Sequence, residues 1–111
     1  MHKIVLIFLS TLSLSYSVDI YETIFDGNCG SCHTQKDESS APTITKVIER
    51  YKKMHPIKDD FIKSLSNWVS NPNKKESLFK DAIKHYGLMP ELGIDKETLQ
   101  GIAKYLYQSK N

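Results

Sequence analysis

Two cysteines and a histidine stand together in the run Cys29-Gly30-Ser31-Cys32-His33. At this spacing each thiol can add across one vinyl group of the same haem, and the adjoining imidazole can bind the iron as an axial ligand. The C-x-x-C-H pattern therefore predicts one covalently bound haem c. Cys29 and Cys32 are the expected thioether positions, and His33 is the expected proximal iron ligand.

The same residue types are also used in two other kinds of site. A C-x-x-C pair in an exported protein can be a redox-active disulfide, but that requires a thioredoxin-like alternation of strands and helices, and little strand pattern is visible. Structural zinc requires a fourth ligand, and no second C-x-x-C or H-x-x-x-H pair occurs. Haem is the favoured interpretation, and both alternatives remain open at this stage.

The sixth coordination position of such an iron decides its chemistry. A methionine opposite the histidine raises the reduction potential and closes the iron for electron transfer, whereas an empty position favours ligand binding or peroxide chemistry. Met89 is the preferred ligand, because it lies in a loop beside Pro90 and outside any helical apolar stripe. The other candidates are Met54, His55 and His85.

The first 17 residues differ from the rest of the chain. A short basic start is followed by an apolar run over residues 4–9 and by a small, hydroxyl-rich stretch that ends at Ser17. This pattern predicts a secretory signal peptide over residues 1–17 that directs the protein to the periplasm and is then removed. The run is too short for an ordinary transmembrane helix, and an uncleaved membrane anchor is the alternative.

Length and composition predict one soluble domain over residues 18–111. The chain has 111 residues, 40% hydrophobic and 25% charged, which is ordinary for a globular protein. Loss of Lys3 with the signal would reduce the formal charge from +2 to +1. A nearly neutral domain gives no case for nucleic-acid binding, which requires a basic surface.

Apolar residues recur at helical spacing and predict an all-α fold. A first helix is expected over 18–26, ended by Gly27-Asn28, and a second over 43–53, ended by His55-Pro56. A third helix should begin near Asp59 or Asp60, either of which can cap it.

Two more helices are expected towards the C-terminus. One should begin with Asn71 as N-cap and Pro72 as its first residue, and end at Gly87. The last should span about 96–108 with Asp95 as its N-cap. Gly101 lies inside it and either lets another helix approach closely or is merely tolerated.

The order of signal, short helix, C-x-x-C-H motif, proline loop, Met89-Pro90 and aromatic C-terminal helix resembles a small bacterial class I cytochrome c. The resemblance covers essentially the whole mature chain. It implies a single-domain fold of about five helices wrapped round one covalently bound haem c. In that family the cysteines form the thioethers, the histidine is the proximal ligand and the loop methionine is the distal ligand. Those roles correspond here to Cys29, Cys32, His33 and Met89.

The resemblance also implies contacts away from the iron. The backbone carbonyl of Pro42 should accept a hydrogen bond from the proximal imidazole. The first and last helices should cross at an aromatic contact, here Phe25 with Ile102 and Tyr105. The family's glycine in the first helix is missing near Tyr21, so either the crossing is looser or Gly101 supplies the room. The indole N–H of Trp68 either reaches a haem propionate, as in the family, or belongs to a core aromatic.

The expected function is electron transport. A cytochrome of this kind is a periplasmic one-electron carrier that cycles Fe(II)/Fe(III) in a respiratory chain and is not an enzyme. Its partners would be redox proteins such as a membrane oxidase or reductase, docked transiently through surface lysines such as Lys36, Lys80 and Lys84. A monomer with no small-molecule substrate is expected. The alternatives are a haem c subunit of a larger redox enzyme, and a haem-based sensor or peroxidase with an open sixth position.

Overall fold

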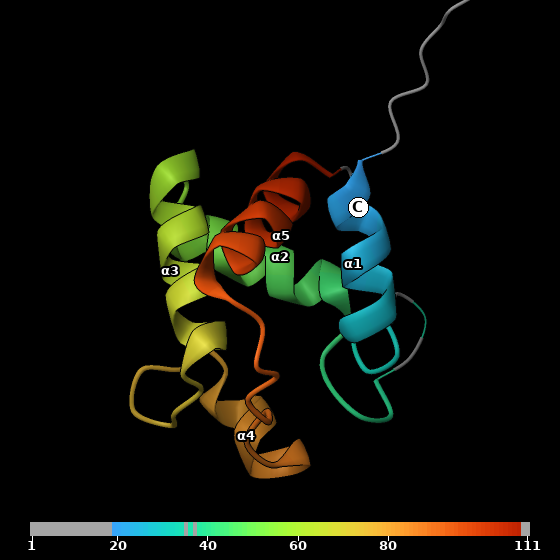
Figure 1. Ribbon diagram of the computed structural model, residues 1–111. Coiled ribbons are helices and arrows are strands. Elements are labelled where there is room, and N and C mark those ends of the chain that lie inside the picture. Colours follow the sequence, from blue (N-terminus) through green and yellow to red (C-terminus); the bar gives the residue numbers. More distant parts are fainter. Residues whose placement is uncertain (1–18, 35, 37, 110–111) are drawn as a thin grey trace, which may run out of the picture.

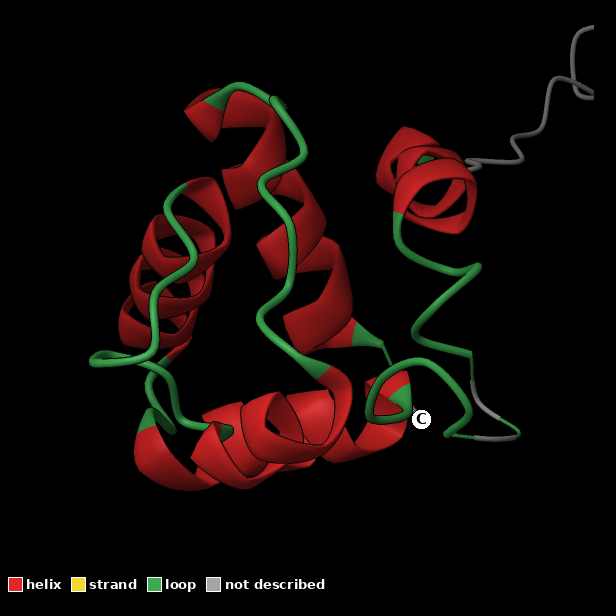
Figure 2. Ribbon diagram, turned by 90° about the horizontal axis from the view of Figure 1, so that it is seen from below, coloured by secondary structure: helices red, strands yellow, loops and turns green. Residues whose placement is uncertain are grey.

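Five α-helices and no strand make up the part of the chain that the computed structural model describes, residues 19–34, 36 and 38–109 (Figure 1). The helices are α1 (Ile20–Asn28), α2 (Ile44–Met54), α3 (Lys58–Ser70), α4 (Lys80–Tyr86) and α5 (Lys96–Gln108). Loops connect them throughout (Figure 2). The all-α, single-domain fold predicted from the sequence is confirmed, while the expected signal peptide, residues 1–17, lies outside the described residues. Within the described ranges, no helix has both the length and the apolar character needed to cross a membrane.

Helix α5 is the element on which the other long helices pack. It contacts α1, α2 and α3, and its most extensive packing is against α3. Its buried side chains recur three or four residues apart, so that they form one apolar stripe along the helix. These residues are Leu99, Ile102, Ala103 and Leu106. The start of α5 is as predicted, because the Asp95 carboxylate accepts a hydrogen bond from the Thr98 amide at 3.0 Å.

The end of α1 differs from the prediction. The helix continues through Gly27 to Asn28, and Cys29 is its C-cap residue, with its amide donating to the Phe25 carbonyl at 2.7 Å. A glycine in the last turn costs about 1 kcal/mol of helix stability at most, and the Asn28 side chain adds a hydrogen bond to the Ile24 carbonyl at 2.9 Å. The haem motif therefore begins directly on the end of a helix.

The third helix begins near Asp59, as predicted, but the predicted cap of this helix and the predicted start of the fourth helix were wrong. Helix α3 begins at Lys58, and its N-cap residue, Ile57, makes no side-chain hydrogen bond. Asp59 and Asp60 lie in the first turn instead, where their negative charge interacts favourably with the helix dipole. Residues 71–79 are not helical, so Pro72 does not begin a helix. The Asn73 side chain accepts from the Glu76 amide at 2.9 Å, and Ser77 accepts from the Phe79 amide at 2.8 Å. Such local bonds satisfy the backbone without a helix.

The crossing of α1 and α5 is close, and Gly101 supplies the room for it. A β-carbon at position 101 would lie 2.3 Å from the ring of Tyr21. Phe25 and Tyr105 meet in the same crossing, with their ring centroids 6.3 Å apart. The glycine that was expected near Tyr21 on the first helix is thus replaced in its role by Gly101 on the last helix.

Replacing Gly101 by alanine should test this compensation, because the resulting change in the free energy of unfolding should have opposite signs with and without the Tyr21 ring. In the wild-type background, Gly101→Ala should lower the free energy of unfolding by about 1 kcal/mol, since the cost of overpacking exceeds the gain in helix propensity. In a Tyr21→Ala background the same change should raise it by up to ~1 kcal/mol, because only the propensity gain remains. Denaturant unfolding of the four proteins measures both values. Equal effects in the two backgrounds would show that Tyr21 does not occupy this space.

Candidate functional site

An open, mainly apolar cavity lies between the helices, with an empty volume of about 1280 Å³, mouth included. Its walls come from all five helices and from the loops before α2 and after α4. The cavity brings together every residue that the sequence singled out for a haem site. These residues are Cys29, Cys32, His33, Pro42 and Met89.

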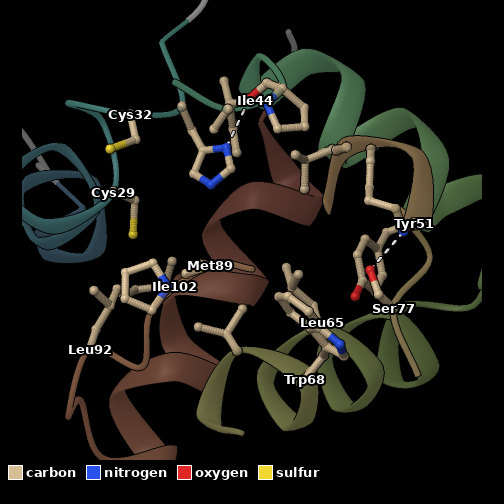
Figure 3. Close-up of a pocket in the computed structure, with 18 of the residues that line it drawn as sticks. Cys29, Cys32, Ile44, Tyr51, Leu65, Trp68, Ser77, Met89, Leu92 and Ile102 are labelled. Atoms are coloured by element: carbon tan, nitrogen blue, oxygen red, sulfur yellow. Dashed lines mark hydrogen bonds between the residues drawn. The ribbon is translucent and has the colours of Figure 1, made fainter. Parts of the chain in front are cut away.

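The two cysteines lie at one side of the cavity, with Tyr51 and Ser77 at the opposite side (Figure 3). Both thiols are free, that of Cys29 half-buried and that of Cys32 exposed. A turn holds them next to each other: the amides of Cys32 and His33 both donate to the Cys29 carbonyl, at 3.2 and 2.9 Å. Burial, and secondarily the nearby Cys32, raises the pKa of the Cys29 thiol. Cys29 is thus a protonated thiol at neutral pH.

The His33 ring is oriented by a single hydrogen bond. Its Nδ1 lies 2.8 Å from the carbonyl oxygen of Pro42. A carbonyl can only accept, so in the neutral imidazole Nδ1 carries the hydrogen and Nε2 keeps a lone pair available for a metal. The Ile44 amide donates to the Thr34 carbonyl at 3.1 Å and closes the base of the loop that carries Pro42. The structure therefore contains the contact expected at Pro42.

Of the four candidates for a second axial ligand, Met89 is the one that lines the cavity. It is half-buried in the loop after Gly87, whose φ of +92° ends α4 in a conformation that favours glycine. Met54 is 58% exposed at the end of α2. His55 is the C-cap residue of that helix, and its Nε2 lies 3.0 Å from the Ser64 hydroxyl. His85 is exposed and lies against the Tyr86 ring.

The side of the cavity away from the cysteines carries polar atoms from aromatic and hydroxyl side chains. The indole N–H of Trp68 donates to the Asn73 carbonyl at 2.9 Å, so its hydrogen is used inside the protein. The Tyr51 ring is 4% exposed, and burial raises the pKa of its hydroxyl to about 12. Tyr51 therefore stays neutral at physiological pH. The sequence marked it as a member of an apolar stripe and did not indicate that it faces a cavity.

The other uses of the cysteine motif find no support in the geometry. Over the described ranges, no cluster of three or more His, Cys, Asp and Glu side chains could hold a metal ion, as a structural zinc site would require. The same ranges contain no strand that could make a thioredoxin-like sheet. The donor set instead fits haem c. Two thiols adjoin a histidine with a free Nε2, a thioether lines the same cavity, and apolar side chains such as Leu65 and Ile102 can cover a flat porphyrin.

Comparison with known proteins agrees with this geometry. The family model described as Cytochrome c matches residues 22–110. A protein of Aquifex aeolicus, itself named only as an uncharacterized protein, is 22% identical over 107 residues, covering 78% of this chain and 70% of the relative. No solved structure matches the chain.

Removal of both thiols should abolish covalent attachment. Wild-type protein matured in the periplasm should keep its pigment through acid-acetone extraction, because thioether bonds resist this treatment. Any pigment bound by a Cys29→Ser/Cys32→Ser variant should pass entirely into the solvent, and absorbance of the two fractions measures the split. These are the only two cysteines of the chain, so no other thiol can substitute. Extraction of the pigment from wild-type protein would contradict covalent attachment.

Proposed function

The chain belongs to the cytochrome c family, and from this premise we propose that it is a one-electron carrier of a respiratory chain in the periplasm. Its cofactor is haem c, covalently bound, and the protein transfers electrons as members of this family generally do. When bound, haem c supplies an iron that alternates between Fe(II) and Fe(III). The observation that carries the proposal is that one apolar cavity is lined by both thiols, by His33 and by Met89.

Each site residue has one task in this proposal. Cys29 and Cys32 would tether the cofactor through thioethers. His33 would bind the iron through Nε2, while its Nδ1 hydrogen stays on the Pro42 carbonyl and fixes the plane of the ring. Met89 would supply the second iron ligand from the protein. A soft thioether opposite an imidazole favours the ferrous state and raises the reduction potential.

The cavity wall contributes by keeping water away. Its lining is mainly apolar and includes Phe25, Leu65 and Leu99. A dry surrounding disfavours the extra positive charge of the ferric state, and it leaves little solvent to reorganise when the charge changes. With His33 and Met89 both binding the iron, no position on the metal would remain for a substrate. This arrangement supports electron transfer over catalysis or gas sensing.

Location and docking follow from the sequence and from the surface lysines. The signal-like residues 1–17 support export to the periplasm. Lys84 is exposed on α4, close in the chain to the loop of Met89, and Lys36 is exposed near the histidine. Lys80 is also exposed and donates to the Lys75 carbonyl at 3.0 Å. Exposed positive side chains such as these favour brief encounters with acidic redox partners.

Met89→Ala should remove the methionine–iron charge-transfer band of the ferric protein and lower the reduction potential, because a weaker ligand replaces the thioether. Met54→Ala is the matched control: it removes a methionine that is 58% exposed and does not line the cavity, and it should leave band and potential unchanged. Optical and redox titration of the holoprotein measures both properties. A band that survives in Met89→Ala would exclude Met89 as the ligand, and a titration that is not a reversible one-electron curve would contradict the carrier function.

Electrostatic docking should appear as opposite salt effects on two small oxidants. Raising the ionic strength should slow oxidation of the ferrous protein by an anionic reagent such as ferricyanide, since salt screens its attraction to the lysines. Oxidation by a cationic cobalt complex should become faster. Lys84→Glu should reduce both effects, and stopped-flow rates measure them. Rates that do not respond to salt would contradict docking through surface lysines.

A further inference from the structure

Helix α4 is held differently from the other helices. Within the described part of the chain, no Cα atom of α4 lies within 8 Å of a Cα atom in α1, α2, α3 or α5, whereas α5 packs closely on three of them. Figure 1 shows α4 set apart from the remaining helices. Met89 follows this helix by only three residues. The position of the methionine therefore depends on side chains that reach α4 from elsewhere.

The beginning of α4 is held by Arg50 of α2. Its guanidinium donates to the Asp81 carboxylate at 2.8 Å and to the Leu78 carbonyl at 3.1 Å. The same group lies over the Phe79 ring, 4.0 Å from the centroid. These contacts fix the entrance of α4, one helix length before the methionine loop.

The end of α4 is held by a hydrogen bond that crosses to the loop before α2. The half-buried Tyr86, the last residue of the helix, donates its phenol hydrogen to the Glu38 carbonyl at 2.7 Å. Glu38 lies in the loop between His33 and Pro42. The bond therefore joins this loop to the end of α4, directly before the loop that carries Met89. The Glu38 carboxylate forms an ion pair with Lys46 of α2 at 2.6 Å, which anchors the acceptor residue.

We propose that Tyr86 is a positioning residue, whose hydrogen bond to Glu38 ties the Met89 loop to the His33 loop and keeps the methionine over the iron. The proposal rests on the proposed function in one respect, namely that Met89 is the distal ligand. A loop with few packed contacts opens at low free-energy cost, and opening exposes the sixth position to external ligands. Loss of the tether shifts this equilibrium towards the open form.

Competition with imidazole on the ferric holoprotein tests the proposal. Imidazole binds where Met89 leaves, and its apparent Kd follows from the loss of the methionine–iron band. Tyr86→Phe keeps the ring and removes only the hydroxyl. One neutral hydrogen bond corresponds to a factor of about 2 to 12 in the opening equilibrium, so Kd should fall by about that factor.

Tyr107→Phe is a matched control. Its phenol also donates to a distant backbone carbonyl, that of Pro56, at 2.8 Å. Tyr107 and Pro56 do not line the cavity, whereas Tyr86 does. This variant loses the same kind of bond, but its imidazole Kd should stay within a factor of about 2 of wild type, below the smallest shift expected for one lost bond near the metal. Equal Kd changes in the two variants, or none in Tyr86→Phe, would overturn the inference.

Amide hydrogen exchange separates this inference from the ligand assignment. In Tyr86→Phe, exchange should accelerate in residues 80–92 and in the loop at 38–42, and it should not do so in Tyr107→Phe. If wild-type ferric protein lacked the methionine–iron band, the ligand assignment would fail and exchange alone would decide on the tether. Unchanged exchange in Tyr86→Phe would then overturn the tether.

Discussion

The hydrophobic core of this protein and the wall of its cavity are largely the same set of side chains. Of the eleven buried apolar residues in the part of the chain that the structure describes, nine also line the cavity, and Ile48 and Phe61 are the two that do not. In the middle of the molecule, these apolar side chains therefore face a cavity as well as one another. In a cytochrome c, the group that fills such a cavity is the haem. A small chain buries a modest apolar area by itself, so a large flat apolar group supplies much of the surface that drives folding.

The two sides of the cavity are held in different ways, one by packed helices and the other by a few side-chain contacts. The cysteine motif begins on the end of α1, which is packed on α5 at Gly101, and the His33 ring is oriented by the Pro42 carbonyl. The methionine side consists of α4 and a loop, held by the Arg50 contacts and the Tyr86 hydrogen bond. Covalent attachment belongs to the side whose helix, α1, packs on α5, and Met89 lies on the side whose helix, α4, packs on no other helix in the described part of the chain.

The sequence could predict those parts of the fold and site whose signals are local. The C-x-x-C-H run, the loop position of Met89 and the Asp95 cap of α5 all lie within a few residues and fix a chemical or geometric outcome. The wrong boundaries arose where two local effects compete. Pro72 after Asn71 resembles a helix start. The side chains of Asn73 and Ser77 instead accept hydrogen bonds from nearby backbone amides, and residues 71–79 are not helical. The Tyr86–Glu38 and Arg50–Asp81 contacts span 48 and 31 residues, and no periodicity in one sequence reports such pairs.

Gly101 shows that a steric requirement can belong to a contact and not to one helix. At a close crossing, one of the two helices must lack a side chain where the other presents a ring. Here α1 carries the ring of Tyr21 and α5 the glycine, although the family's glycine is expected on the first helix. Either arrangement lets Phe25 and Tyr105 approach and brings the end of α1, with Cys29, to the edge of the cavity. The crossing requires a close approach of the two helices, because this approach determines where Cys29 lies relative to the cavity.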